Sequence, residues 1–358
     1  MYIMIKYVIW ILMIFINSLE IVNAQEPGGK QNHWKLGGAV GMDFAQMLFV
    51  NPKFGAGEDK IGIGGNLSFF AKYKQNRLSW DNFLGLTFGV QRLGSFRRQI
   101  PFQKSVDELR LTSKFGYSIT DQSPFGYAFD VLFLSQITPT FEGNILSPNS
   151  DSVTLPIAQF CSPATLTLSP GIGFKKKTNL GEFHALLSPA SLKLIFVASD
   201  TTARLGLHGY PYSTGVTEQE FIDTWGVRPD GQFGTNIFYA KNSIQFGATL
   251  KAGYSHKFFK YKEGEKDKFR LVLATTLNLY SNYMRMPQHI DVEWITNVDL
   301  MLFKGLSISL MTNLFWDYDV LVQVDEDGDI TTGVNGYESQ GRRVSFMQSL
   351  LIKYNFLF

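Results

Sequence analysis

Long segments in which apolar and polar residues alternate constrain the fold of this chain more than any other feature. In residues 243–255, Ile244, Phe246 and Leu250 belong to an apolar row, and the residues between them are mostly polar or glycine. Residues 78–91 follow the same pattern. Side chains two residues apart lie on the same face of a β-strand, so each segment predicts a strand with one apolar and one polar face.

Segments of this kind follow one another along the whole chain. Their approximate bounds are residues 34–48, 61–74, 78–92, 106–119, 125–137, 164–175, 182–197, 243–258, 268–283, 290–303, 306–318 and 344–358. Most are about twice as long as the strands of globular proteins, which have about 5–6 residues. A tilted strand needs roughly 9–11 residues to cross the hydrocarbon core of a membrane. The segment lengths therefore favour membrane-spanning strands.

The connections between these segments are alternately long and short. The odd-numbered connections are the longer ones, among them residues 138–163 and 198–242. If the first strand starts on the periplasmic side, the short connections lie in the periplasm and the long ones outside the cell, as in outer-membrane barrels. Hydrocarbon demands a closed barrel, whose apolar face points to lipid. The sequence therefore predicts an all-β fold, a transmembrane antiparallel β-barrel of about 12 strands, with short periplasmic turns and longer extracellular loops.

The N-terminal residues have the features of a secretory signal peptide. Lys6 precedes an apolar run over residues 7–16, and Val22-Asn23-Ala24 provides a cleavage site. The alternative, a membrane-anchoring helix, needs roughly 20 apolar residues, more than this run supplies. We expect residues 1–24 to be the signal peptide, residues 25–33 a short periplasmic lead, and residues 34–358 the barrel in the cell outer membrane.

Composition and motifs argue against several classes of function. With 33 basic and 31 acidic residues, the chain offers no electrostatic case for binding nucleic acid. A single cysteine, Cys161, allows no intramolecular disulfide. The sequence has no nucleophile elbow, HExxH motif or paired histidines, so we expect no enzyme, metal or cofactor. A lipid-modifying enzyme that uses His184, His208 or His256 is the distant alternative.

Charged residues in the polar rows predict a lumen that carries both signs. The acidic candidates for the lumen are Asp81, Asp130, Asp291, Glu293, Asp299 and Asp317. The basic candidates are Lys72, Arg110, Lys114, Lys251 and Arg270. Unpaired charges in a narrow interior are costly, so mixed signs indicate either ion-paired networks or water. Two hypotheses stay open: ion pairs that block the lumen, or a solute path lined by the acidic segments 290–303 and 306–318.

Two local features interrupt the strand pattern. Pro170 and Pro189 lie inside predicted strands, where each loses a ladder hydrogen bond. Folding the hairpin between them brings the two prolines together, which predicts a shared bulge or thin spot, with residues 182–197 as the least regular strand. The alternative is a strand count that is wrong by one hairpin.

In the longest connection, Thr217-Glu218-Gln219-Glu220 matches a capping box and predicts a helix over 218–224, either plugging the mouth or lying outside it.

The last residues of the chain, Ser349 to Phe358, are mainly apolar and aromatic. Tyr354, Phe356 and Phe358 lie in the lipid-facing row of the predicted last strand. A terminal aromatic residue resembles the assembly signal that the barrel-assembly machinery reads in many outer-membrane proteins. We expect this strand to pair with the first, near residues 34–44, and to close the barrel.

Several short motifs, taken together, resemble those of a known family. They are Trp80-Asp81-Asn82, Lys104-Ser105-Val106-Asp107-Glu108-Leu109, Leu187-Ser188-Pro189, Tyr280-Ser281-Asn282-Tyr283, Ile290-Asp291-Val292-Glu293-Trp294, Trp316-Asp317-Tyr318-Asp319 and Gly341-Arg342-Arg343-Val344. Their order resembles that in a family of outer-membrane barrel proteins from Bacteroidota, known as a domain of unknown function, over residues 34–358. The family has Gly-Pro-Arg where this chain has Gly341-Arg342-Arg343, which affects only the turn. The resemblance implies the barrel fold, and no activity or functional residue.

A non-enzymatic outer-membrane barrel leaves two main hypotheses for function. The first is a channel or plugged pore for small solutes. The second is an accessory or scaffold barrel that docks through its loops onto a larger outer-membrane export or uptake complex. The expected partners are outer-membrane lipid, the barrel-assembly machinery during biogenesis and, in the second hypothesis, an unidentified outer-membrane protein.

Overall fold

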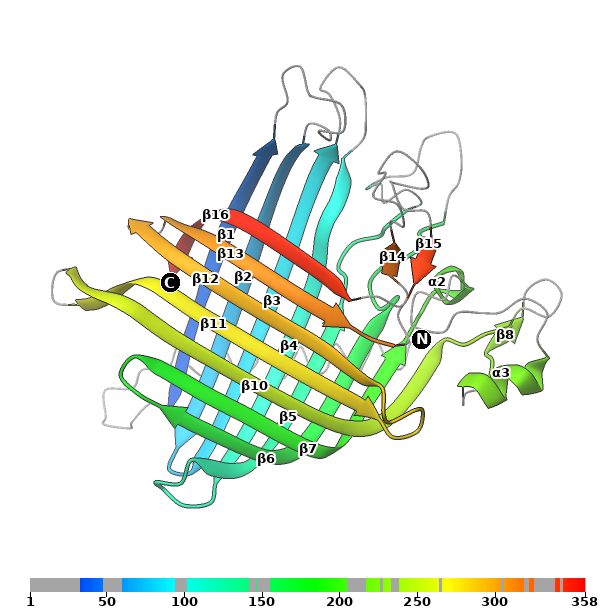
Figure 1. Ribbon diagram of the computed structural model, residues 1–358, viewed down its shortest axis with the longest axis horizontal. Coiled ribbons are helices and arrows are strands. Elements are labelled where there is room, and N and C mark those ends of the chain that lie inside the picture. Colours follow the sequence, from blue (N-terminus) through cyan, green and yellow to red (C-terminus); the bar gives the residue numbers. More distant parts are fainter. Residues whose placement is uncertain are drawn as a thin grey trace, which may run out of the picture.

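Twelve strands of the described chain form one closed antiparallel barrel (Figure 1). The computed structural model describes residues 33–47, 60–93, 102–141, 146, 155–204, 217–225, 228–232, 238–263, 266–303, 306–318, 322–324, 339–341 and 344–357. In ring order the strands are β1 (Trp34–Met47), β16 (Ser345–Leu357), β13 (Leu306–Trp316), β12 (Ile290–Phe303), β11 (Lys266–Asn282), β10 (Asn242–Glu263), β7 (Gly181–Phe196), β6 (Ala164–Lys177), β5 (Phe125–Ser135), β4 (Gln103–Ser118), β3 (Leu78–Leu93) and β2 (Lys60–Gln75). Each predicted segment corresponds to one of these strands, so the predicted antiparallel barrel is confirmed.

The connections follow the predicted alternation of short and long. The short ones are residues 76–77, 119–124, 178–180, 264–265 and 304–305. The longer ones are residues 48–59, 94–102, 136–163, 197–241, 283–289 and 317–344. In an up-and-down barrel, connections of the same parity lie at the same end. One end of the barrel therefore has the short connections and the other carries the longer ones.

β10 is the strand that departs most from its predicted bounds. It continues to Glu263, whereas the alternation predicted an end near residue 258. The register with β11 is the same on both sides of Phe259, with Phe258 opposite Leu271 and Lys260 opposite Phe269, and Phe259 itself has a positive φ of 54°. Phe258 and Phe259 are adjacent apolar residues that break the alternating pattern, which is why the sequence predicted a longer turn than the structure has.

The apolar residues of the barrel strands lie on the outer surface. Large side chains such as Tyr127 (65% exposed), Ile244 (57%) and Trp294 (50%) are exposed along the strands. In a globular protein, side chains of this kind form the core. Here the fully buried strand residues are mostly small and polar, as Ser307 and Ser309 are. The barrel therefore has an apolar outside and a polar inside.

β7 contains the irregularity that the two prolines predicted. Its register with β6 breaks between Leu168 and Ile172, and its register with β10 breaks at the same level. In both ladders β7 contributes one residue more than its neighbour across the break. Ser188 Oγ donates a hydrogen bond to the carbonyl oxygen of Pro170 (2.6 Å) across the break. The shared bulge is confirmed, and the alternative strand count is wrong.

The long connections carry small elements of their own. These are α2 (Asp200–Arg204), α3 (Glu218–Trp225), β8 (Gly231–Gln232), β9 (Phe238–Tyr239), β14 (Val322–Val324) and β15 (Ser339–Gly341). α3 has the predicted capping box, because the Glu220 N–H donates to Thr217 Oγ1 (3.2 Å) and the Thr217 N–H to the Glu220 carboxylate (2.7 Å). α3 lies clear of the barrel in Figure 1, so this helix does not plug the mouth. Neither α2 nor α3, the helices of the described chain, is long and apolar enough to cross a membrane.

Pairing between the first and last strands closes the barrel. β1 and β16 are antiparallel, with Val40 opposite Phe356 and Met42 opposite Tyr354. This is the predicted closure near residues 34–44. Phe358 and the predicted signal peptide, residues 1–24, lie outside the described residues.

Candidate functional site

A row of alternating charges crosses four neighbouring strands of the barrel. Lys72 of β2 is opposite Asp81 of β3, which in turn is opposite Lys114 of β4. Lys114 is opposite Asp130 of β5. Residues that are directly opposed share one face of a sheet, and opposite charges in such positions attract each other. Four of the charges predicted for the lumen are thus brought together as one row.

The ion pair between Asp130 and Lys251 places this row on the inside of the barrel. Lys251 Nζ lies 2.5 Å from Asp130 Oδ2, although β6 and β7 separate β5 from β10 in the ring. A contact between strands that are not neighbours must cross the interior. The side chain of Asp130 is only 4% exposed and that of Lys251 only 17%. The pair therefore narrows the lumen.

A second set of contacts also crosses the interior. Lys193 Nζ of β7 lies 3.9 Å from Asp291 of β12, and β10 and β11 lie between the two strands. The same ammonium lies 5.1 Å from the ring centre of Tyr280. Glu293 of β12 interacts electrostatically with Arg110 of β4, on the opposite wall. The lumen charges are thus engaged with one another, as the ion-pair hypothesis expects.

Two predicted lumen charges lie apart from these contacts. Arg270 is near the start of β11, and its guanidinium lies 5.6 Å from the ring centre of Tyr261. Asp299 of β12 is opposite Ser309 of β13.

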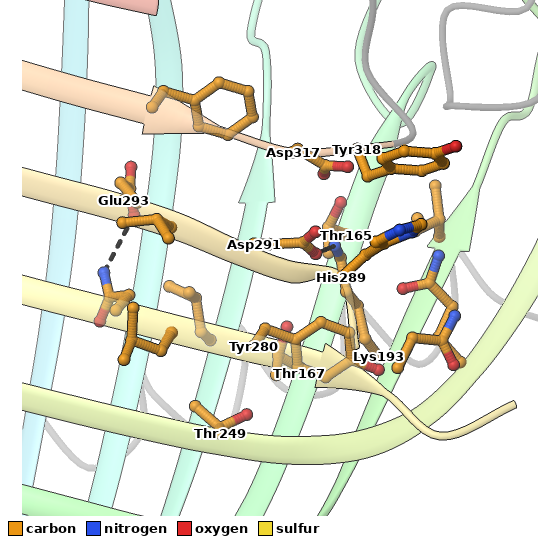
Figure 2. A pocket seen from close by; sticks show the side chains of 18 of the residues that line it. Thr165, Thr167, Lys193, Thr249, Tyr280, His289, Asp291, Glu293, Asp317 and Tyr318 are labelled. Atoms are coloured by element: carbon orange, nitrogen blue, oxygen red, sulfur yellow. Dashed lines mark hydrogen bonds and ion pairs between the residues drawn. The ribbon is translucent and has the colours of Figure 1, made fainter. Parts of the chain in front are cut away.

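A cavity of about 360 Å³ lies inside the barrel, between two facing walls (Figure 2). Thr249 of β10, Tyr280 of β11 and Asp291 of β12 form a row of directly opposed residues along one wall. A second row on the same wall consists of Lys251, Asn278, Glu293 and Phe315. The facing wall contributes Leu132, Leu134, Thr165, Thr167 and Lys193. Asp317 and the connection before β12, which supplies Arg285 and His289, also contribute to the lining.

Polar contacts hold much of the cavity lining in place. Asn278 Nδ2 donates a hydrogen bond to Glu293 Oε2 (2.9 Å), and the two residues are opposite each other. The His289 ring stacks on Tyr318, with ring centres 3.7 Å apart. Side chains fixed by such contacts form a preformed site, which is usual for small-molecule binding.

The sequence pointed to the acids of this cavity but not to several of its other residues. Lys193 was missed because it follows the bulge in β7, where one extra residue changes the phase of the alternation. Tyr280 and Thr249 give no sequence signal, since a tyrosine or threonine in a strand is ordinary. His289 lies in a connection, where alternation makes no prediction.

Reactive groups are sparse in the described part of the chain. Cys161 lies in the connection between β5 and β6, half-buried, and burial raises the pKa of its thiol. His256 Nδ1 lies 3.0 Å from the hydroxyl of Tyr254. Within the described residues, no group of three or more His, Cys, Asp and Glu side chains is arranged to hold a metal ion.

Comparisons with known proteins give one family match and several structural likenesses. Residues 44–141 match a family described as a protein of unknown function (DUF3078). The COG4313 outer membrane channel from Pseudomonas putida F1 has 12% identity and a TM-score of 0.37, and the match covers 94% of this chain and 100% of that one. The β domain of the Bordetella autotransporter BrkA has 9% identity and a TM-score of 0.33, covering 91% and 99%.

A third solved structure and the curated sequences complete the comparison. A Pseudomonas aeruginosa FadL homologue has 8% identity and a TM-score of 0.29, with 91% of this chain and 89% of that chain covered. No curated protein sequence matches. The family match runs from the last residues of β1 to just after β5, and its description assigns no activity.

Proposed function

We propose that this protein is an integral outer-membrane β-barrel that acts as a selective channel for small polar solutes. The observation that carries the proposal is a cavity lined in part by polar and charged side chains, between facing walls of a closed barrel whose outer surface is apolar. An apolar outer surface suits lipid, and a polar interior suits the passage of water-soluble molecules.

The ion pairs inside the barrel favour selectivity over free diffusion. The contacts of Asp130 with Lys251 and of Lys193 with Asp291 cross the interior at different places. A solute must pass beside these charges, so size and hydrogen bonding would determine which molecules enter. This combines the two hypotheses for the lumen: the charges are paired, and a space beside them is lined by Asp291 and Glu293.

The location in the outer membrane is part of the proposal. Residues 1–24 would direct export, and Phe358 with Phe356 and Tyr354 would be read by the barrel-assembly machinery. The motifs quoted above favour an origin in Bacteroidota. Cell fractionation followed by extraction of the membranes tests the location, and recovery of the protein in the soluble periplasm would contradict it.

Conductance in planar lipid bilayers tests the channel. We expect small, discrete current steps from the purified protein, because the crossing ion pairs leave a narrow path. The variant Asp130→Asn/Lys251→Met removes one crossing pair and should increase the step size. Absence of steps from both proteins, each shown to be folded, would overturn the channel proposal.

A scaffold function is the second candidate, and the folded external elements favour it. Phe221 of α3 is only 1% exposed, and its ring lies 6.3 Å from that of Phe238 in β9. A connection with its own packed contacts can present a defined surface to another protein. Crosslinking in intact cells tests this candidate, and failure to recover any stable outer-membrane partner would exclude it.

A further inference from the structure

Three polar groups that line the cavity have no hydrogen-bond partner within the described structure. They are the hydroxyl of Tyr280, the hydroxyl of Thr249 and Nδ1 of His289. Thr249 is only 4% exposed and is directly opposite Tyr280 on the neighbouring strand. Buried polar groups in native proteins are rarely left unpaired. Three such groups around one cavity indicate that a ligand supplies their partners.

The charges around these groups are already engaged. Lys193 contacts Asp291, and Lys251 contacts Asp130. Glu293 accepts a hydrogen bond from Asn278. An anionic or cationic ligand would have to compete with these pairs. The unpaired groups are hydroxyls and an imidazole nitrogen, which favours a ligand without charged groups.

Hydroxyls can both donate and accept a hydrogen bond, and an imidazole nitrogen can do either according to its tautomer. The hydroxyls of an alcohol have the same property, so a ligand with several hydroxyls can satisfy all three groups in either direction. Figure 2 shows Thr249 and Tyr280 on neighbouring strands, with Thr165, Thr167 and Lys193 also around the cavity.

Apolar surface lies beside these polar groups. Leu132 and Leu134 come from one wall, Phe315 from the other, and Tyr318 stacks on His289 near the connection. Aromatic faces attract weakly positive groups such as the C–H bonds of a sugar ring. A ligand with hydroxyls at its edge and C–H groups on its faces matches this lining, and the cavity volume of about 360 Å³ suits a small molecule.

We infer that the cavity binds a neutral polyhydroxylated solute, a sugar of one or two rings, with Tyr280 and Thr249 as hydrogen-bonding residues. The inference rests on the proposed channel function, since it identifies the solute that the channel takes. Contacts of the charged side chains Lys193, Asp291 and Glu293 hold the cavity wall in position. The same side chains exclude charged solutes that would compete with the sugar.

Isothermal titration calorimetry tests the inference. The purified protein is held in lauryldimethylamine oxide, whose headgroup contains no sugar, and is titrated with glucose, maltose, betaine and succinate. We expect saturable binding of glucose or maltose and none of betaine or succinate. Tyr280→Phe and Thr249→Val each remove one hydroxyl with little change in volume and should weaken binding about fivefold.

Tyr127→Phe is the matched control, because Tyr127 is 65% exposed on the outer surface. Its affinity should equal that of the unmodified protein, and all variants are checked for the folded barrel by the migration of unboiled samples on gels. Binding of betaine or succinate instead of sugars, or sugar binding unaffected by Tyr280→Phe and Thr249→Val, would overturn the inference. No binding of any probe would also overturn it.

Conductance separates this inference from the proposed function. Discrete current steps without sugar binding would leave the channel intact and overturn the sugar site. Sugar binding without current steps would leave the site intact and overturn the channel. If both hold, maltose should reduce the current through the unmodified protein. The Tyr280→Phe variant should need about fivefold more maltose for the same reduction.

Discussion

At the scale of single residues, the pair between Asp130 and Lys251 is a buried contact whose loss should lower stability. Removing one partner breaks a buried ion pair, which costs about 3 kcal/mol in typical proteins. We therefore expect Lys251→Met to lower the free energy of unfolding by about 3 kcal/mol. Denaturant unfolding of the protein in lipid vesicles, followed by tryptophan fluorescence, measures the change.

Two further variants make that measurement specific. Asp130→Asn/Lys251→Met removes both charges, so most of the lost stability should return. Lys175→Met removes an exposed partner from the pair with Glu182 (3.2 Å, 61% and 31% exposed) and should cost less than about 1 kcal/mol. If Lys251→Met and Lys175→Met lower the free energy of unfolding equally, the interior pair is as solvated as a surface pair.

Cys161 provides a second prediction at this scale. Burial raises the pKa of its thiol, and only the thiolate reacts with alkylating reagents. Well below the pKa, each unit of increase lowers the thiolate fraction about tenfold. We expect iodoacetamide to modify Cys161 more slowly at pH 8 in the folded protein than in the chain unfolded in urea. Equal rates in the two states would contradict the burial of this thiol.

At the scale of secondary-structure elements, the bulge in β7 depends on a small group of serines. Ser191 is fully buried, and its Oγ lies 2.9 Å from Ser188 Oγ and 3.1 Å from Ser169 Oγ. Ser188 in turn donates to the carbonyl of Pro170. These hydroxyls compensate for ladder hydrogen bonds that the register break removes.

Ser191→Ala should therefore destabilise the barrel by about 1–2 kcal/mol, because it removes hydrogen bonds in a buried site. The free energy of unfolding in lipid vesicles gives the value. Ser105→Ala is the control: Ser105 is exposed on β4 and should change stability by less than about 0.5 kcal/mol. A Ser191→Ala protein as stable as this control would mean that the hydroxyl cluster contributes nothing to the bulge.

The strands were predictable because alternation is a local property of the sequence. Each strand from β1 to β16 in the barrel corresponds to one alternating segment, and even the bulge was indicated by Pro170 and Pro189. The sequence could not predict on which face of β7 Lys193 lies, because that depends on where the extra residue of the bulge is accommodated. The end of β10 was missed because the adjacent Phe258 and Phe259 break the alternation inside a continuous strand.

At the scale of the whole molecule, strand order could be predicted but contacts across the interior could not. Neighbouring strands in the ring are also successive barrel strands along the chain, so alternating connection lengths were enough to indicate the topology. The contacts of Lys251 with Asp130 and of Lys193 with Asp291 join strands that are not neighbours. They depend on the curvature of the barrel, which no local pattern in the sequence encodes. The unpaired groups of the cavity depend on the same curvature.

Closure of the barrel between β1 and β16 gives a test of the complete topology. Gly41 is directly opposite Asn355. Directly opposed residues in antiparallel strands have Cα atoms about 4.5–5.5 Å apart, within the span of a disulfide. In a Cys161→Ser background, Gly41→Cys/Asn355→Cys should therefore form a disulfide under mild oxidation. Mass spectrometry of the digested protein identifies the link, and the boiled, unreduced protein should migrate differently on gels from its reduced form.

The matched control moves one cysteine along β16. Leu351 is opposite Ser309 of β13 and lies four residues from Asn355, about 13 Å along the strand, too far for a disulfide with position 41. Gly41→Cys/Leu351→Cys should therefore stay reduced under the same conditions. If both pairs form the link equally, or if only the displaced pair does, β1 and β16 are not joined in this register and the barrel closes in another way.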